Sequence, residues 1–103
     1  MKTADESASM DPVIRDKRTD ILRIARAHGA TNIRVFGSRA RGTARPDSDL
    51  DLLINLEPGR HLFDLVAIKL DLEDLLGRKV HVVTEGGISR YIRDEVMREA
   101  VPL

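Results

Sequence analysis

A short run of alternating acidic and aliphatic residues, DLDLLI at positions 49–54, restricts the fold more than any other part of the sequence. Strand side chains alternate between the two faces of a sheet, so Asp49 and Asp51 project to one face and the neighbouring aliphatic side chains to the other. The aliphatic face requires a covering layer of helices, whereas the acidic face is expected to be accessible to solvent. The two carboxylates, roughly 7 Å apart between Cα atoms, can converge on one or two hard cations.

Helical and strand patterns alternate along the rest of the chain. Apolar residues recur at helical spacing in three segments, and three β-prone runs lie between them. The expected helices cover about 12–28, 62–76 and 88–99, and the expected strands cover 32–36, 49–55 and 79–83. Residues 37–48 contain two glycines and a proline and are expected to form a loop with one helical turn. This order predicts an α/β (α+β) fold in which helices pack on a small sheet.

Length and composition exclude several classes of protein. The 103 residues fit one domain, expected over 11–103 after a flexible segment at 1–10, with Met10 as an alternative start. The 17 basic residues balance 17 acidic ones and only 3% of residues are aromatic, so direct nucleic-acid binding is not expected. With no cysteine, a thiolate zinc site is excluded. No apolar run approaches the roughly 20 residues of a membrane helix, and no signal core is present, so a cytoplasmic location without a membrane partner is expected.

A glycine–serine turn precedes the acidic strand. Glycine lets a backbone approach a phosphate closely, amides at a helix start attract anions, and the Ser38 hydroxyl can donate to a phosphate oxygen. After Gly37 and Ser38, the arginines Arg39, Arg41 and Arg45 add positive charge that no acidic residue interrupts. A phosphate cradle beside a dicarboxylate site predicts a protein that binds a nucleotide and a divalent cation. The alternatives are a solvated arginine loop and two ordinary surface acids, although like charges on one strand face repel.

The combination of these two features resembles a known family. Gly37-Ser38, ten intervening residues and Asp49-x-Asp51 match the G-S-x(10)-D-x-D signature of the DNA polymerase β-like nucleotidyltransferase superfamily. The stretch VFGSRARGTARPDSDLDLLI is similar to the minimal nucleotidyltransferases of bacteria and archaea, and the resemblance extends over the chain from about residue 12. It implies a mixed β-sheet flanked by helices that binds ATP with Mg²⁺. By motif position, Gly37 and Ser38 would hold the distal phosphates, and Asp49 and Asp51 would ligate the magnesium.

The resemblance also implies an activity and a partner. Minimal members resemble the antitoxin of two-gene systems whose toxin is a HEPN ribonuclease, and the implied reaction transfers AMP from ATP to a tyrosine of that toxin within a hetero-oligomer. Arg39 and Arg41 would lie along the triphosphate, although Arg41 could equally brace the loop. One alternative is a catalytically degenerate module that neutralises the toxin by binding alone. Another is a nucleotidyltransferase for a small molecule or an RNA end.

The chain departs from the family at the expected third carboxylate. Family members carry a pattern like K-V-D-x-V on a later strand, whereas this sequence reads KVHVV at 79–83, with His81 in place of the acid. Alternation along the strand points His81 away from the apolar face, and Glu85 beyond the strand does not replace the acid. Neutral histidine can be a base and a ligand, but Mg²⁺ prefers oxygen donors. His81 is a working substitute, a sign of lost catalysis, an engineered or strain-level change, or a residue without a role.

The remaining candidates have structural interpretations. His28 is expected near a helix C-terminus and His61 near a helix start, both away from the chemistry. Tyr91 is expected to be a core or interface residue, and helix 88–99 to turn a core stripe inward, with a partner-binding stripe as the alternative. The apolar tail at 100–103 is expected to dock on the domain or on a partner.

Overall fold

The computed structural model describes residues 12–41 and 49–103, and for Ser38 and Arg41 it describes the backbone alone. The helices are α2 (Pro12–Asp16), α3 (Arg18–Ala27), α4 (Ser38–Arg41), α5 (Leu62–Leu76) and α6 (Arg93–Glu99), with a 3₁₀ turn η1 (Glu85–Gly87) before α6. The strands are β1 (Ala30–Phe36), β2 (Leu50–Leu56), β3 (Val80–Thr84) and β4 (Val101–Pro102). The predicted α/β (α+β) class is confirmed, as are the single helical turn after the first strand and the long helix at 62–76.

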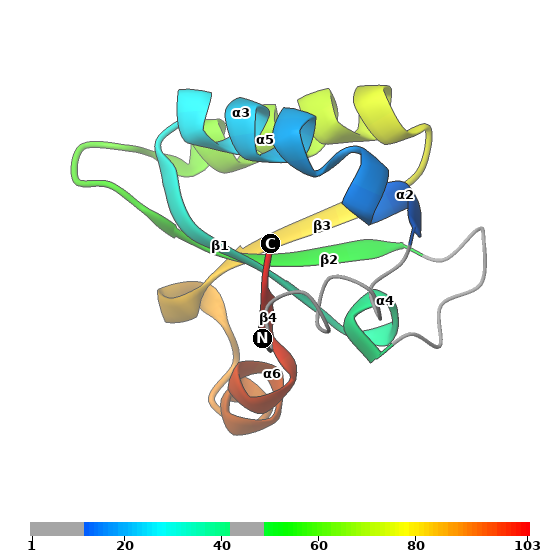
Figure 1. Cartoon of the computed structure of the whole chain (residues 1–103). Coiled ribbons are helices and arrows are strands. Elements are labelled where there is room, and N and C mark those ends of the chain that lie inside the picture. Colours follow the sequence, from blue (N-terminus) through cyan, green and yellow to red (C-terminus); the bar gives the residue numbers. More distant parts are fainter. Residues whose placement is uncertain (1–11, 42–48) are drawn as a thin grey trace.

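The strands form one mixed sheet in the order β3-β2-β1-β4. β1 is antiparallel to both β2 and β4, whereas β2 and β3 are parallel. A parallel pair requires a crossover connection, which α5 supplies. In Figure 1, α3 and α5 lie side by side over one face of the sheet, and α4 and α6 lie on the other side. The sheet therefore has one face covered by two long helices and one face that is more open.

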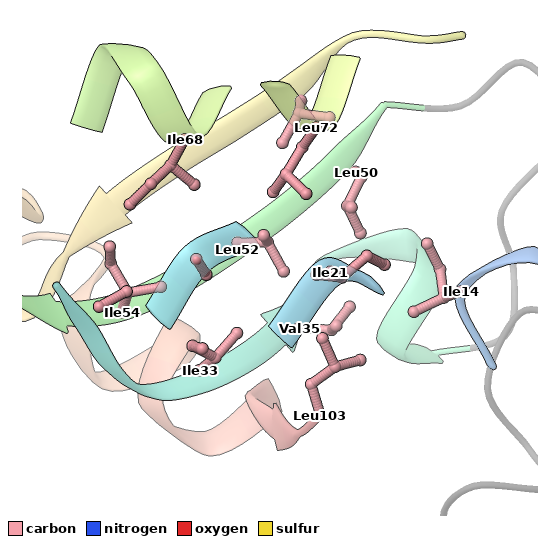
Figure 2. Packing of buried hydrophobic residues seen from close by; sticks show 13 residues of the cluster. Ile14, Ile21, Ile33, Val35, Leu50, Leu52, Ile54, Ile68, Leu72 and Leu103 are labelled. Carbon is pink, nitrogen blue, oxygen red and sulfur yellow. The ribbon is translucent and has the colours of Figure 1, made fainter. Parts of the chain in front are cut away.

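The hydrophobic core lies between the sheet and the helices α3 and α5 (Figure 2). Leu50, Leu52 and Ile54 of β2 are completely buried in it, as the alternation predicted. Ile68 and Leu72 of α5 reach down onto the strands from above. Burial of each such side chain stabilises the fold by about 1.5–3 kcal/mol. The covered face is thus a continuous aliphatic layer that fixes the orientation of β2.

The first expected helix is divided into two. α2 ends at Asp16 and α3 begins at Arg18, because Lys17 leaves helical geometry with a ψ of 6°. Gly29 adopts a φ of +86° one residue beyond the C-cap His28 and ends the helical segment before β1. The flexible segment expected at 1–10 lies outside the described residues.

The helix expected at 88–99 is shorter than predicted, and the prediction that its apolar stripe faces the core is wrong. The Thr84 hydroxyl accepts from the amide of Gly87 and stabilises the 3₁₀ turn η1, and turns follow up to Ile92. α6 therefore begins only at Arg93, and of the expected apolar stripe Val96 is buried while Tyr91 is 85% exposed.

The C-terminal tail docks on the domain. Val101 and Pro102 pair with β1, Leu103 is buried, and the Arg18 Nε donates to the Leu103 carbonyl oxygen at 2.7 Å. The expectation that the tail packs on this domain is confirmed. Among the residues that the structure describes, no helix combines the length and the apolar character that crossing a bilayer demands.

Candidate active site

The turn between β1 and α4 lies directly against the acidic strand. Phe36, the last residue of β1, pairs with Asp51 of β2, and Gly37 follows with a φ of +76°. A Cβ atom on Gly37 would stand 2.5 Å from the Asp51 Oδ2. The left-handed backbone therefore favours glycine, and a Cβ atom there would also displace the Asp51 carboxylate. The structure places the predicted phosphate-binding turn next to the predicted cation site, with Ser38 as the first residue of α4.

Asp49, Asp51 and His81 meet on the open face of the sheet. Asp51 is in register with His81 across the parallel β2–β3 pair, so the two side chains project to the same face. Asp49 precedes β2 by one residue, and its Oδ2 lies 2.9 Å from the Nε2 of His81. The side chains of His81 and Asp49 are 51% and 45% exposed. The three residues singled out from the sequence thus form one solvent-accessible group.

The contact between His81 and Asp49 has a clear electrostatic consequence. The carboxylate accepts from the Nε2–H of a neutral imidazole and forms an ion pair with a protonated one. A donor beside Asp49 offsets part of the repulsion between two carboxylates on one strand face. The histidine therefore stabilises the acidic pair instead of adding a third negative charge to it.

The donor set fits a magnesium ion only in part. The carboxylates of Asp49 and Asp51 are the oxygen ligands that Mg²⁺ prefers, whereas the imidazole of His81 is a nitrogen donor that it does not favour. Within 12–41 and 49–103, no three acidic, histidine or cysteine side chains already surround a common point at metal-binding distance. At this site two of the three candidates are in contact, and Asp51 projects beside them.

The arginines of the turn have different environments. Arg39 lies in α4 and is almost completely buried, at 1% exposure, so its guanidinium contacts the interior of the fold and not the solvent. Burial of this kind favours a structural role for Arg39 in α4. The side chain of Arg41 and the whole of Arg45 lie outside the described part of the chain.

A second charged group on the open face was not singled out from the sequence. The buried guanidinium of Arg34 lies 2.7 Å from the Glu85 Oε2, and its Nη2 also donates to the Asn55 Oδ1 at 2.9 Å. The Glu85 carbonyl oxygen accepts from Arg93 of the α6 segment. Glu85 is therefore engaged in holding η1 and α6 to the sheet. In the sequence, this group could have been recognised from a charged arginine that stands between two aliphatic residues of an expected strand.

The other two histidines lie away from the site, as expected. His28 follows α3 and its Nε2 lies 3.0 Å from the Asp71 Oδ2 of α5, so it links the two covering helices. His61 caps the start of α5, where its amide donates to the Asp64 Oδ2 at 2.9 Å. That hydrogen bond is the main reason why the pKa of Asp64 lies below its ordinary value.

Comparison with known proteins places this geometry in a family. Residues 18–103 match the nucleotidyltransferase domain family. The relative named "Putative protein adenylyltransferase MJ0435", from Methanocaldococcus jannaschii, is 36% identical over 88 residues, which are 85% of this chain and 95% of that protein. The protein adenylyltransferase MntA of Thermococcus cleftensis is 38% identical over 73 residues, which are 71% of this chain and 74% of that one.

Two solved structures share the fold. A structure described as a "putative minimal nucleotidyltransferase" is 51% identical, with a TM-score of 0.79 over 87% of this chain and 92% of that chain. A toxin–antitoxin structure with AMP-PNP is 20% identical, with a TM-score of 0.71 over 82% of this chain and 69% of that chain, and it shows likeness of fold alone. The family match over most of the chain, the two sequence relatives and the 51% identical structure identify this chain as a minimal nucleotidyltransferase of the nucleotidyltransferase domain family.

Proposed function

We propose that this chain is an antitoxin that transfers AMP from ATP to a tyrosine of a cognate HEPN ribonuclease toxin in the cytoplasm. The observation that carries the proposal is the placement of Asp49, Asp51 and His81 on one exposed face, directly beside the Gly37 turn. Relatives named protein adenylyltransferases support AMP transfer to a protein, and the toxin–antitoxin structure of the same fold supports a toxin as the acceptor. The HEPN class and the tyrosine follow from the sequence resemblance.

Different residues of the site would bind the phosphates of ATP and the cation. Gly37 lets the backbone approach the distal phosphates, and Ser38 at the start of α4 supplies a hydroxyl and an amide for them. Asp49 and Asp51 hold a divalent cation, for which the resemblance implies Mg²⁺. When bound, such a cation neutralises charge on the phosphates and favours loss of pyrophosphate.

The transfer itself is a displacement at phosphorus. The acceptor hydroxyl oxygen forms a bond to the α-phosphorus, the bond from that phosphorus to the bridging oxygen breaks, and pyrophosphate leaves. The proton of the hydroxyl passes to water, which reaches this half-exposed site. His81 is the third member of the site and orients Asp49 through their hydrogen bond.

Exposed apolar side chains support a hetero-oligomer. Contiguous apolar surface on a small domain is typical of sites that contact another protein. One such surface follows the outer side of α5, and another surrounds α6 on the same side of the sheet as the site (Figure 1). Their members are Leu62, Phe63, Val66 and Leu70 for α5, and Tyr91, Ile92 and Met97 for α6.

A second candidate function is favoured by one residue. Because His81 stands where an acid is expected, the chain could neutralise a toxin by forming a complex without transferring AMP. This alternative requires the same partner but no chemistry at Asp49 and Asp51. The two candidates therefore differ in whether the acidic pair is needed.

The test measures the intact mass of the partner. The purified chain is incubated with ATP, a divalent cation and the product of the neighbouring gene. We expect the partner to gain the mass of one or more AMP groups, and the gain to disappear in Asp49→Ala/Asp51→Ala. Asp20→Ala, which removes a partly exposed carboxylate of α3 that belongs to neither apolar surface, is the matched control and should transfer AMP normally.

Two results would contradict the enzyme proposal. One is a stable complex whose partner never changes mass. The other is neutralisation of the toxin in cells that survives Asp49→Ala/Asp51→Ala. Either result would support the binding module instead.

A further inference from the structure

The third member of the cation site is a nitrogen donor that points at one of the carboxylates. The Nε2 of His81 and the Oδ2 of Asp49 are 2.9 Å apart, and Asp51 projects to the same face from the register position opposite His81. Both contacting side chains are about half exposed, so an ion and its water ligands can reach them. A nitrogen donor at this position suits Mg²⁺ poorly, because Mg²⁺ prefers oxygen ligands.

The spacing of the two donor atoms is already that of neighbouring ligands on one ion. Octahedral ions with bonds of about 2.1 Å hold adjacent ligands about 3.0 Å apart, since the separation is √2 times the bond length. The separation of the two atoms therefore already matches that of neighbouring ligands, and binding an ion would require the imidazole and the carboxylate to turn from each other toward it. Asp51 and the phosphate oxygens of a nucleotide can complete the coordination, because nucleotide-bound ions typically use one or two carboxylates.

The chemical type of the donor atoms determines which metal ion the site binds more tightly. Imidazole is a favourable ligand for Zn²⁺, Fe²⁺ and the later first-row ions, Mn²⁺ has the weakest affinity of that series, and Mg²⁺ prefers oxygen donors. We propose that the site of Asp49, Asp51 and His81 binds divalent first-row transition-metal ions, Mn²⁺ included, in preference to Mg²⁺, with His81 Nε2 and Asp49 Oδ2 as adjacent ligands. This inference rests on the proposed function only in taking the open face as the cation site.

The molecule contains a matched pair that serves as an internal control. His28 and Asp71 are 3.0 Å apart through the same two atom types, at the junction of α3 and α5. The other acid near His28 is Asp64, which already accepts from the Arg60 guanidinium and the His61 amide. A histidine–aspartate contact alone is therefore present at both places, but only the His81 site has a further acid in register on the neighbouring strand.

The experiment uses Mn²⁺ as the probe, added to the full chain without acceptor or nucleotide. Pulsed electron paramagnetic resonance detects a ligand nitrogen through its coupling to the manganese. We expect nitrogen coupling in the wild type and in His28→Ala, and none in His81→Asp or His81→Ala. Competition with Mg²⁺ should show that His81→Asp lowers the preference for Mn²⁺ by about tenfold or more. The exposed position of His81 favours folding of both variants, which circular dichroism checks.

Three results would overturn the inference. They are a wild type that binds no Mn²⁺, a bound Mn²⁺ without nitrogen coupling, and an unchanged metal preference in His81→Asp. The second result would make His81 a base or a structural residue instead of a ligand. The electron paramagnetic resonance and competition experiments do not measure AMP transfer, so a chain that transfers no AMP can still show the metal preference. If the metal preference is absent, the mass measurement still tests AMP transfer with Mg²⁺.

Discussion

The two faces of the sheet are made by alternate residues of the same strands, yet different interactions determine which side chains fit on each face. On the covered face, Leu50, Leu52 and Val80 are fully buried under α3 and α5. On the open face, their neighbours Asp49, Asp51 and His81 remain accessible and form specific polar contacts. Any aliphatic side chain of similar volume can serve on the first face, because burial is not directional. On the second face the identity of each atom matters, since donors and acceptors must match. The comparison separates residues that stabilise the fold from residues that carry its chemistry.

The largest effect should come from the covered face. Leu52→Ala removes a completely buried side chain and leaves a cavity, so we expect the free energy of unfolding to fall by about 2–5 kcal/mol. Chemical denaturation followed by circular dichroism measures the loss. Asp51→Asn on the open face is the comparison and should change the free energy of unfolding far less. Equal losses in the two variants would contradict the division between the faces.

A smaller effect is expected where the open face does contribute to stability. Glu85→Gln removes the ion pair with Arg34, a buried guanidinium, while Glu85 itself is partly exposed. We expect a loss of about 1–3 kcal/mol in the free energy of unfolding, because a buried charge is left less well paired. Glu95→Gln, at an exposed position of α6, is the matched control. If the two variants unfold at the same denaturant concentration, the Arg34 group does not hold α6 to the sheet.

Substitution of Gly37, in the turn beside the site, should change both the stability of the fold and the affinity for the cation. Gly37→Ala places a Cβ against the Asp51 carboxylate and strains a left-handed backbone, whereas Gly77→Ala meets nothing within 4 Å at a similar φ of +67°. Both variants should lose about 1–2 kcal/mol of stability from the backbone. Only Gly37→Ala should also weaken binding of the cation, measured by Mn²⁺ titration. Identical cation affinities would show that the contact between Gly37 and Asp51 has no role in the site.

The smallest effect concerns pH at the start of α5. The pKa of Asp64 is lowered chiefly by the hydrogen bond from the His61 amide and further by Arg60. A lowered folded-state pKa means that this stabilisation is complete above the ordinary value of 3.8 and is lost as the pH falls through the lower folded value. Asp64→Asn should therefore be less stable than the wild type near neutral pH, and the difference should shrink below about pH 3.8. Thermal unfolding at several pH values, with Asp94→Asn as control, measures it. A difference that persists unchanged at low pH would contradict the assignment.

Local patterns predicted the elements whose residues carry their own signal. The alternation in β2, the apolar spacing of α5 and the glycine after β1 depend on neighbours within a few positions, and all three are found as expected. The helix expected at 88–99 exists only from Arg93, because the hydrogen bond from the Gly87 amide to Thr84 and the turns around Ser89 replace its first part. Apolar spacing alone cannot reveal such side-chain hydrogen bonds.

By itself, the sequence determined which strand face is apolar and which residues lie on the other, because alternation is a property of any extended backbone. It also placed glycine at the turn before the acidic strand. Tertiary structure alone decided that His81 contacts Asp49, that Arg34 pairs with Glu85 and that the tail closes against β1. The physical reason is register: 32 residues separate His81 from Asp49, and only the pairing of β2 with β3, set by burial of the covered face, aligns them.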